Sequence, residues 1–339
     1  MKNNDWIAID AASGDLGYEP IVNGAGLAIR EFNAKIILVG KKEILTNLVS
    51  RHEFLSASKN VEIEHAAEVV GMSDQAARAV KSRPDSSIMV CSRLVKEKRA
   101  IGFFSPGNTG ASMAAALLLL GRLPGVKRPV IATPLPRYGY GATTLLDAGA
   151  NVDSKPEYLV QAAIMGEIYS REIFNIIHPA VGLLSNGEEE NKGNDLTQSA
   201  FENIKKLPLN FIGNVEGRDL FGYGKPVDVV VCDGFIGNIV IKTIEGTAKA
   251  IFNTMRNNIK SSNLAKTGAL LLKPTLSAVK SQMDHSNYGG APLLGVNGIV
   301  IIGHGSSNAW SVRSAIKTTI EFANHNINSS IIENIQRFS

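Results

Sequence analysis

The chain has 339 residues, of which 44% are hydrophobic and 19% are charged, as is typical of a folded globular protein with a sizeable core. Its net charge of +4 and its lack of any block of Lys or Arg argue against a nucleic-acid-binding protein. The two cysteines lie far apart without metal-ligand spacing, which argues against a disulfide framework and a structural zinc site.

The N-terminal region contains no targeting or membrane-spanning pattern. An apolar segment over residues 6–10 follows the polar start directly and leaves no room for a secretory signal. The longest strictly apolar run, residues 113–120, is far shorter than the roughly 20 residues that span a bilayer. We therefore expect a cytoplasmic protein in a reducing compartment.

Short apolar runs bounded by Gly, Pro, Asn or Asp predict a series of buried strands. In chain order they cover residues 6–10, 36–39, 101–104, 130–135, 143–146, 181–184, 209–212, 227–231 and 298–302. Longer segments with helical apolar spacing lie between them, for example residues 108–120, 156–170, 194–205 and 236–259. This alternation predicts a three-layer αβα fold of the α/β class with a mostly parallel sheet.

No internal repeat or clean domain boundary interrupts the pattern, so we expect one α/β domain over residues 1–325 and a polar C-terminal tail over 326–339. Residues 252–290 lack a clear alternation and predict a helical excursion, in which Pro274 argues against one straight helix. Two interpretations stay open: a hairpin packed on the core, or an amphipathic face for an anionic membrane or a protein partner. The residues expected in such a contact are Lys266, Leu270, Leu271, Leu272 and Lys273.

Several common nucleotide-binding and hydrolase signatures are missing. No G-x-G-x-x-G follows a strand, and neither G-x-x-x-x-G-K-[ST] nor G-x-S-x-G occurs. These absences argue against ordinary dinucleotide binding, the common phosphate-cradling loop and a serine hydrolase.

A candidate anion site follows the predicted strand 101–104, in the loop Ser105-Pro-Gly-Asn-Thr-Gly110. Its small residues let a ligand approach the backbone, and the free amides at the start of the next helix favour phosphate or an oxyanion. The alternative is that Asn108 or Thr109 only caps the helix.

Two more loops, residues 147–153 and 232–238, also follow predicted strands. Asp147 and Asp233 can orient a donor, accept a proton or cap a turn. Asn151 and Asn238 can polarise a carbonyl group. With no histidine cluster nearby, a metal site is the weakest option, and we expect none.

Cationic side chains and one histidine occupy the remaining Gly-rich loops. Lys192 follows the glutamates at 188–190, a charge run that is typical of a solvated face. It lies just before a predicted helix start. Arg218 is suited to bidentate phosphate contact. His304, framed by two glycines and followed by two serines, is the histidine with the most suggestive surroundings.

Taken together, these loops resemble those of the bacterial phosphate acyltransferases, the acyl-carrier-protein:phosphate transacylases of phospholipid synthesis. The resemblance extends over about residues 6–323 and rests on the stretches 107–111, 146–153, 187–193, 211–219, 231–238, 288–298 and 304–307. The first loop departs from the family pattern at Ala12, Ser13, Leu16 and Tyr18.

The resemblance implies a reaction in which inorganic phosphate displaces acyl carrier protein from a long-chain acyl thioester and gives an acyl phosphate. It also implies a fold related to isocitrate dehydrogenase and phosphotransacetylase, a homodimer and loose association with the membrane. We expect no cofactor. Such a site must bind phosphate beside the thioester, stabilise an oxyanion and help the thiolate to leave.

Our hypothesis distributes these tasks over the loops. The candidate catalytic residues are Lys192, Asp233, Asn238 and His304. The candidate phosphate- or substrate-binding residues are Gly107, Asn108, Thr109, Gly110, Asn151, Asn214, Arg218 and Ser306. Asn151, Asn238 or amides of residues 233–238 would stabilise the oxyanion, and His304 would donate to the leaving sulfur or to phosphate.

Three other functions stay open at this point. A short-chain phosphotransacetylase would use coenzyme A, for which the sequence has no dedicated adenine motif. A dehydrogenase would keep the fold but require a nicotinamide site. A scaffold at the membrane would be inactive.

Overall fold

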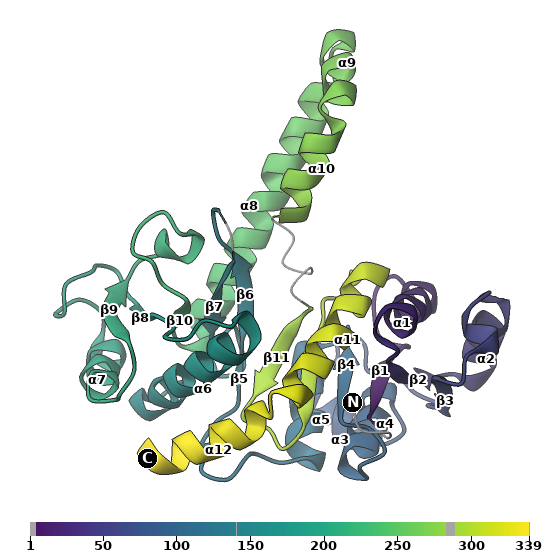
Figure 1. The fold of residues 1–339 in the computed structure, drawn as a ribbon, viewed down its shortest axis with the longest axis horizontal. Coiled ribbons are helices and arrows are strands. Elements are labelled where there is room, and N and C mark those ends of the chain that lie inside the picture. Colours follow the sequence, from purple (N-terminus) through teal and green to yellow (C-terminus); the bar gives the residue numbers. More distant parts are fainter. Residues whose placement is uncertain (1–4, 140, 283–288, 339) are drawn as a thin grey trace.

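The computed structural model describes residues 5–139, 141–282 and 289–338 and arranges their strands in two sheets (Figure 1). The large sheet has the order β3 (Val61–His65), β2 (Lys35–Gly40), β1 (Trp6–Asp10), β4 (Gly102–Ser105), β12 (Ile299–Ile302), β11 (Ala291–Leu294) and β5 (Val130–Ile131). The small sheet has the order β6 (Thr133–Pro136), β7 (Ala142–Leu146), β10 (Val229–Val231), β8 (Val181–Leu184) and β9 (Phe211–Val215).

Most neighbouring strands are parallel, and the antiparallel pairs are β11 with β12, β11 with β5, and β6 with β7. The predicted α/β class with mostly parallel pairing is therefore confirmed, although the strands are divided between two sheets. The predicted strand 130–135 is in fact β5 followed by β6, one in each sheet.

Helices cover both faces of the large sheet because alternate side chains of its strands point in opposite directions. One layer holds α1 (Tyr18–Phe32) and α11 (Ala309–Asn324), and the other holds α4 (Ser87–Lys96) and α5 (Thr109–Leu119). In β1, Ile7 and Ile9 belong to the apolar cluster of the first layer and Ala8 to that of the second. At the edge beyond β2 lie α2 (Lys42–Arg51) and a one-turn helix, Leu55–Ala57.

The small sheet lies between α6 (Pro156–Phe174) and the first turns of α8 (Gly234–Lys260), while α7 (Asp195–Ile204) packs against α6. A one-turn helix, Asp219–Phe221, contributes to the α8 side. The α6 side is continuous with the core beneath α1 and α11, so one apolar cluster joins the two sheets.

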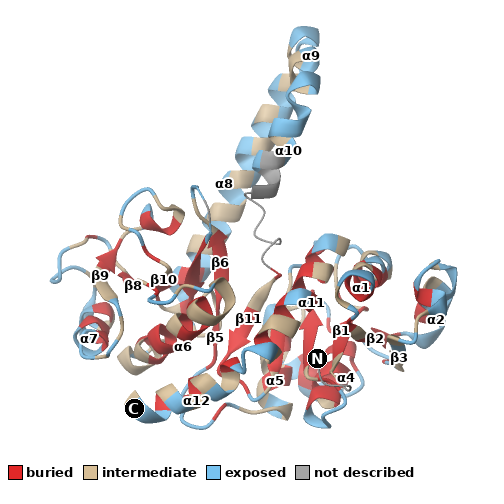
Figure 2. Ribbon diagram, viewed as in Figure 1, coloured by how far each residue is buried: buried red, intermediate tan, exposed pale blue. Residues whose placement is uncertain are grey.

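Beyond the small sheet α8 runs out from the body of the molecule, α9 (Asn263–Leu271) lies at the far end, and α10 (Lys273–Gln282) leads back (Figure 1). We call α8, α9 and α10 the hairpin. Pro274 lies in the first turn of α10, so the expected break is present. No residue of α9 is buried, and Leu264, Leu270 and Leu271 are 85%, 70% and 78% exposed (Figure 2). The interpretation of a hairpin packed on the core is therefore wrong.

The C-terminal segment is a helix, α12 (Ile327–Phe338), rather than a polar tail. Ile327, Ile331 and Ile335 are fully buried, and α12 packs against α6. Their four-residue spacing puts them on one face of the helix, while the polar residues between them gave the segment its polar composition. Two strands were also missed, because β3 alternates with glutamates at a sheet edge and β11 contains Pro292.

Replacing Ile331 with alanine should lower the free energy of unfolding by about 2–5 kcal/mol, because a fully buried side chain is removed and a cavity remains. Urea denaturation of the full chain measures this change. Glu333→Ala, on the exposed side of α12, is the control and should have an effect below about 0.5 kcal/mol. Equal effects of the two substitutions would show that α12 does not belong to the core.

Candidate functional site

A buried carboxylate organises the loops at the edge of the large sheet. Asp10, at the end of β1, accepts hydrogen bonds from the Ser105 hydroxyl at 2.8 Å and from the Ser13 backbone amide at 3.1 Å. The Ser105 oxygen in turn accepts from the amide of Gly107 at 3.2 Å. Burial raises the pKa of Asp10, and the hydroxyls of Ser87, Ser13 and Ser105 counteract that rise. Asp10 thus connects the loop after β1 to the loop after β4.

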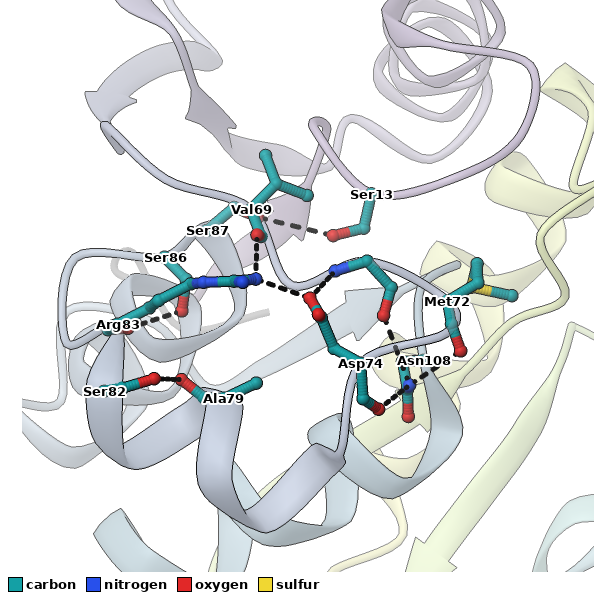
Figure 3. A network of polar contacts seen from close by, with 11 residues as sticks. Ser13, Val69, Met72, Asp74, Ala79, Ser82, Arg83, Ser86, Ser87 and Asn108 are labelled. Carbon is teal, nitrogen blue, oxygen red and sulfur yellow. Dashed lines mark hydrogen bonds and ion pairs between the residues drawn. The ribbon is translucent and has the colours of Figure 1, made fainter.

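Asn108 caps α5, as one of the two sequence interpretations predicted. Its Oδ1 accepts from the amide of Ala111 at 3.0 Å, and its Nδ2 group donates to backbone oxygens of Gly71, Met72 and Asp74 (Figure 3). The side chain is therefore engaged within the protein. The groups left for a ligand at this position are the amides of Thr109 and Gly110, which precede the capped Ala111 amide, and the exposed Thr109 side chain.

The loop after β12 meets the same edge, because β1, β4 and β12 are neighbours in the sheet. A Cβ on Gly14 would lie 3.3 Å from Pro106 and 3.6 Å from the carbonyl oxygen of Gly305, so the three loops come together at Gly14. The structure therefore brings Gly107, Asn108, Thr109 and Gly110 to the same edge as His304 and Ser306.

Ser306 sets the tautomer of His304. The Ser306 amide donates to Nδ1 of His304 at 3.3 Å, and the Ser306 hydroxyl lies 2.8 Å from the same nitrogen. A nitrogen that accepts a hydrogen bond carries no proton, so the neutral imidazole of His304 has its proton on Nε2. His304 is exposed, which makes that N–H accessible to a ligand.

A second buried carboxylate, Asp147, organises the edge of the small sheet. Its oxygens accept from the backbone amides of Ile131, Gly149, Ala150 and Asn151 at 2.8–3.2 Å. Burial raises the pKa of Asp147, and these hydrogen bonds oppose that rise. Since Ile131 belongs to β5, the carboxylate also joins the two sheets.

Both hydrogens of the Asn151 side-chain amide form hydrogen bonds within the protein. Its Nδ2 group donates to the Asp147 carboxylate at 2.8 Å and to the carbonyl oxygen of Pro129 at 2.7 Å. In this geometry Asn151 holds the loop closed, and no hydrogen of its side chain is left for a substrate oxygen.

The first turn of α8 lies directly against the 147–151 loop. Asp233 caps the helix, since its Oδ1 accepts from the amide of Ile236 at 2.9 Å, and a Cβ on Gly237 would lie 1.9 Å from the Asp147 carbonyl oxygen. Asn238 faces the same loop, because a Cβ on Gly149 would lie 3.4–3.6 Å from its side-chain atoms. The exposed Asn238 amide forms no hydrogen bond with another described residue.

A third group surrounds an open cavity of about 530 Å³ beside β9. Lys192 and Arg218 both line this cavity, together with Glu188, Glu189 and Glu216. Arg218 lies 2.8 Å from Glu188 and 3.0 Å from Glu216. Hydrogen bonds from Arg218 and Lys225 lower the pKa of Glu188, so an anion here would compete with carboxylates.

Asn214 is buried in β9 and contacts the glutamate loop that lines this cavity. Its Nδ2 group donates to the carbonyl oxygen of Glu189 at 2.8 Å, and its Oδ1 has no partner among the described residues. The amide thus fixes the glutamate loop to β9, on the outer side of the small sheet.

The predicted site residues therefore divide between the two sheets. The α5 start, His304 and Ser306 lie at the large sheet, whereas the remaining candidates lie at the small sheet. The 147–151 loop connects these regions, because Ala148 and Ala150 pack against the apolar cluster that includes α5. The hairpin residues that were expected to contact a membrane or a partner lie apart from both groups of site residues, since the hairpin points away from the sheets (Figure 1).

The sequence analysis missed two features of the site. Asp10 lies at the end of a buried strand, directly before a Gly-containing loop. This position could have identified Asp10 as a residue that accepts hydrogen bonds from the loops at the sheet edge. The segment 69–75, to which Asn108 donates, carries no motif. Within the described part of the chain, no group of three His, Cys, Asp or Glu residues could hold a metal ion, and no helix has the length and apolarity to cross a membrane.

Comparison with known sequences identifies close relatives along the whole chain. The family model described as fatty acid synthesis protein matches residues 6–330. A protein named phosphate acyltransferase from Leptospira biflexa is 56% identical over 333 residues, covering 98% of this chain and 97% of its own. A protein of the same name from Acidobacterium capsulatum is 47% identical over 325 residues, covering 96% and 95%.

Comparison with solved structures identifies the fold. A phosphotransacetylase from Streptococcus pyogenes has a TM-score of 0.61 at 19% identity, with 96% of this chain and 95% of that chain covered. A phosphotransacetylase from Staphylococcus aureus has a TM-score of 0.58 at 16% identity, covering 98% and 94%. The expected relationship to the phosphotransacetylase fold is confirmed.

Gly237→Ala should lower the free energy of unfolding by about 1–3 kcal/mol, because its methyl group would collide with the Asp147 carbonyl oxygen. It should also reduce activity by moving α8 away from the 147–151 loop. Gly246→Ala is a control in the same helix, where nothing lies within 4 Å, and should raise stability by up to about 1 kcal/mol. Urea denaturation distinguishes the two, and equal stabilisation by both would contradict the close packing.

Proposed function

We propose, from the premise that this chain belongs to the fatty acid synthesis protein family, that it transfers a long-chain acyl group from acyl carrier protein to inorganic phosphate. The chain is an acyltransferase, as its relatives named phosphate acyltransferase indicate. The products would be an acyl phosphate and free acyl carrier protein, which supply phospholipid synthesis. The observation that carries the proposal is that the loop leading into α5 meets the His304 loop at Gly14, through Pro106 and Gly305.

The start of α5 is the proposed phosphate site. Phosphate is an anion and already a nucleophile, so the protein need only hold it and orient it. The first amides of a helix and its dipole favour an anion, and the small residues Gly107 and Gly110 permit its close approach. Asn108 contributes by capping the helix rather than by direct contact.

The proposed chemical step transfers the acyl group in one addition and elimination. A phosphate oxygen forms a bond to the thioester carbonyl carbon, the carbonyl oxygen becomes an oxyanion, and the carbon–sulfur bond then breaks. The electron pair of that bond goes to sulfur. The protonated Nε2 of His304 is suited to donate to the leaving thiolate, because Nδ1 is held by Ser306.

Asn238 is the better of the two asparagine candidates for the oxyanion. Its amide is exposed, whereas the amide hydrogens of Asn151 are engaged by Asp147 and Pro129. Asn238 also lies against the loop whose Ala148 and Ala150 reach the α5 layer. A donor that is free to reach the carbonyl oxygen can stabilise charge as it develops there.

Lys192 and Arg218 are proposed to act on the acidic substrates rather than at the reacting carbon. Both line the cavity at the outer side of the small sheet. Because Arg218 is already paired with two glutamates, it favours a transient anionic contact over a tight phosphate site.

The active form is proposed to be a homodimer. The hairpin is the proposed contact with an anionic membrane surface. The leucines of the hairpin are exposed beside Lys266 and Lys273, and this combination favours the interface of an anionic membrane. A lipid surface nearby would receive the long-chain product.

Purified protein should form acyl phosphate from acyl-acyl carrier protein and phosphate, and should use acyl-coenzyme A poorly. Asn238→Ala should reduce turnover by about 10²- to 10³-fold through loss of an oxyanion donor. His304→Ala should reduce it by at least about 10²-fold through loss of a proton donor. Asn258→Ala, far along α8 from the site, is the control and should retain the normal rate.

Three outcomes of that assay separate the claims. Near-normal rates for both Asn238→Ala and His304→Ala would remove these role assignments but leave the reaction intact. A preference for acyl-coenzyme A would replace the proposed donor, and complete inactivity towards both donors would refute the proposed reaction.

Lys266→Glu combined with Lys273→Glu should weaken binding to vesicles of anionic phospholipid by more than tenfold, since each lysine near such a surface contributes about 1 kcal/mol. Co-sedimentation measures the binding. Lys41→Glu with Lys42→Glu makes the same charge change at α2, away from the hairpin, and should have little effect (Figure 1). Unchanged binding of the hairpin variant would refute the membrane contact.

A further inference from the structure

Residues 71–74, in the segment after β3, form a closed turn that contacts the start of α5. The Asp74 amide donates to the carbonyl oxygen of Gly71 at 3.2 Å, and the Gly71 amide donates to the Asp74 carboxylate at 2.7 Å. These reciprocal hydrogen bonds give residues 71–74 one fixed shape (Figure 3).

Arg83, at the end of α3 (Ala76–Ser82), ties this turn to the preceding backbone. Its Nη1 donates to the Asp74 carboxylate and to the Val69 carbonyl oxygen at 2.9 Å. The hydrogen bond from Arg83 lowers the pKa of Asp74, and the carboxylate raises that of Arg83, so both groups stay charged. One guanidinium group therefore holds both ends of the segment 69–74.

The turn presents three carbonyl oxygens to a single side chain of the α5 start. Nδ2 of Asn108 lies 3.3 Å from Gly71 O, 3.1 Å from Met72 O and 3.3 Å from Asp74 O. An amide has only two hydrogens, so at least one is shared. This arrangement requires Oδ1 to point the other way, towards the Ala111 amide that it caps.

A second contact couples the two helix starts. A Cβ on Gly110 would lie 3.0 Å from the Ala76 side chain, so the first residue of α3 rests on the first turn of α5. Behind the turn lies a cavity of about 260 Å³, lined by Asp74, Gln75, Arg78 and Arg83 among others. The position of the turn is therefore set by the polar contacts of Arg83 and Asn108 together with the apolar contact of Ala76.

We infer that the Asp74–Arg83 pair is a positioning element for the anion site: through the 71–74 turn and Asn108 it sets the direction of the α5 amides towards phosphate. The inference rests on the proposed function. Neither residue touches the reacting atoms. Their effect follows because the amides at a helix start bind an anion well only when they are held in the right direction, so a displaced α5 start should bind phosphate more weakly.

Arg83→Gln tests the inference, with Arg99→Gln as the matched control. Arg99 pairs with Glu64 of β3 at 2.9 Å and is exposed to a similar extent as Arg83, but it makes no hydrogen bond or ion pair with the described residues of the turn. In steady-state assays Arg83→Gln should raise the KM for phosphate about tenfold, which is the change in affinity that the loss of one net hydrogen bond produces. The value of kcat and the KM for the acyl donor should change less than twofold.

Arg83→Lys should restore most of the phosphate affinity, because a lysine keeps the charge and can donate to Asp74. The thermal midpoints of all variants should stay close to that of the unmodified protein, since a pair about one-third exposed contributes little to global stability. Arg99→Gln should leave every kinetic constant unchanged. An unchanged phosphate KM in Arg83→Gln, or equal losses in kcat and both KM values with a lowered midpoint, would overturn the inference.

Hydrogen–deuterium exchange supplies a readout that does not depend on turnover. Arg83→Gln should accelerate exchange over residues 69–75 and the first turn of α5, and should leave α11 unchanged. Inorganic phosphate should slow exchange at residues 107–112 of the unmodified protein and do so less in the variant. If the Arg83→Gln variant exchanges at the same rates as the unmodified protein, the positioning role is overturned. If the unmodified protein forms no acyl phosphate, only the proposed reaction is refuted.

Discussion

One buried carboxylate, that of Asp147, connects the two sheets by hydrogen bonds, in addition to the apolar cluster that the sheets share. It is 3% exposed and accepts hydrogen bonds from Ile131 in the large sheet and from the amides of residues 149–151 in its own loop. A buried carboxylate without partners would be strongly destabilising, so the loop must adopt a shape that turns its amides inward. The outer side of that loop is the surface on which Gly234 and Gly237 of α8 pack.

Asp10 has the corresponding role at the large sheet, where it orders the loops that meet at Gly14. Carboxylates at strand ends are thus engaged in holding backbone. The groups left for ligands are backbone amides at the start of α5 and a few exposed side chains, such as Asn238 and His304. Such a division suits the proposed reaction, whose nucleophile, phosphate, needs no activation by the protein.

Much of the fold could be predicted, because β1 and β8 are short, mainly apolar segments bounded by polar or turn-forming residues, a combination that favours a buried strand. The division into two sheets could not, since residues 130–135 read as one short strand despite Thr133 and Pro134, and only the pairing partners separate β5 from β6. Within the site, the cap at Asn108 follows from local sequence. Its contact with residues 71–74 joins positions more than 30 apart, and no local pattern encodes it.

The length of α8 links the site to the hairpin tip. The helix begins at Gly234, packed against the Asp147 loop, and has 27 residues, which corresponds to about 40 Å. Its start is fixed by contacts that tolerate no added methyl group, whereas the helix beyond it, α9, has no buried residue. A helix held at one end transmits its orientation to the other. If the tip rests on a membrane, as proposed, the distance from Asn238 to the lipid surface is set by α8 itself, and the acyl product leaves a site at fixed height above the membrane that receives it.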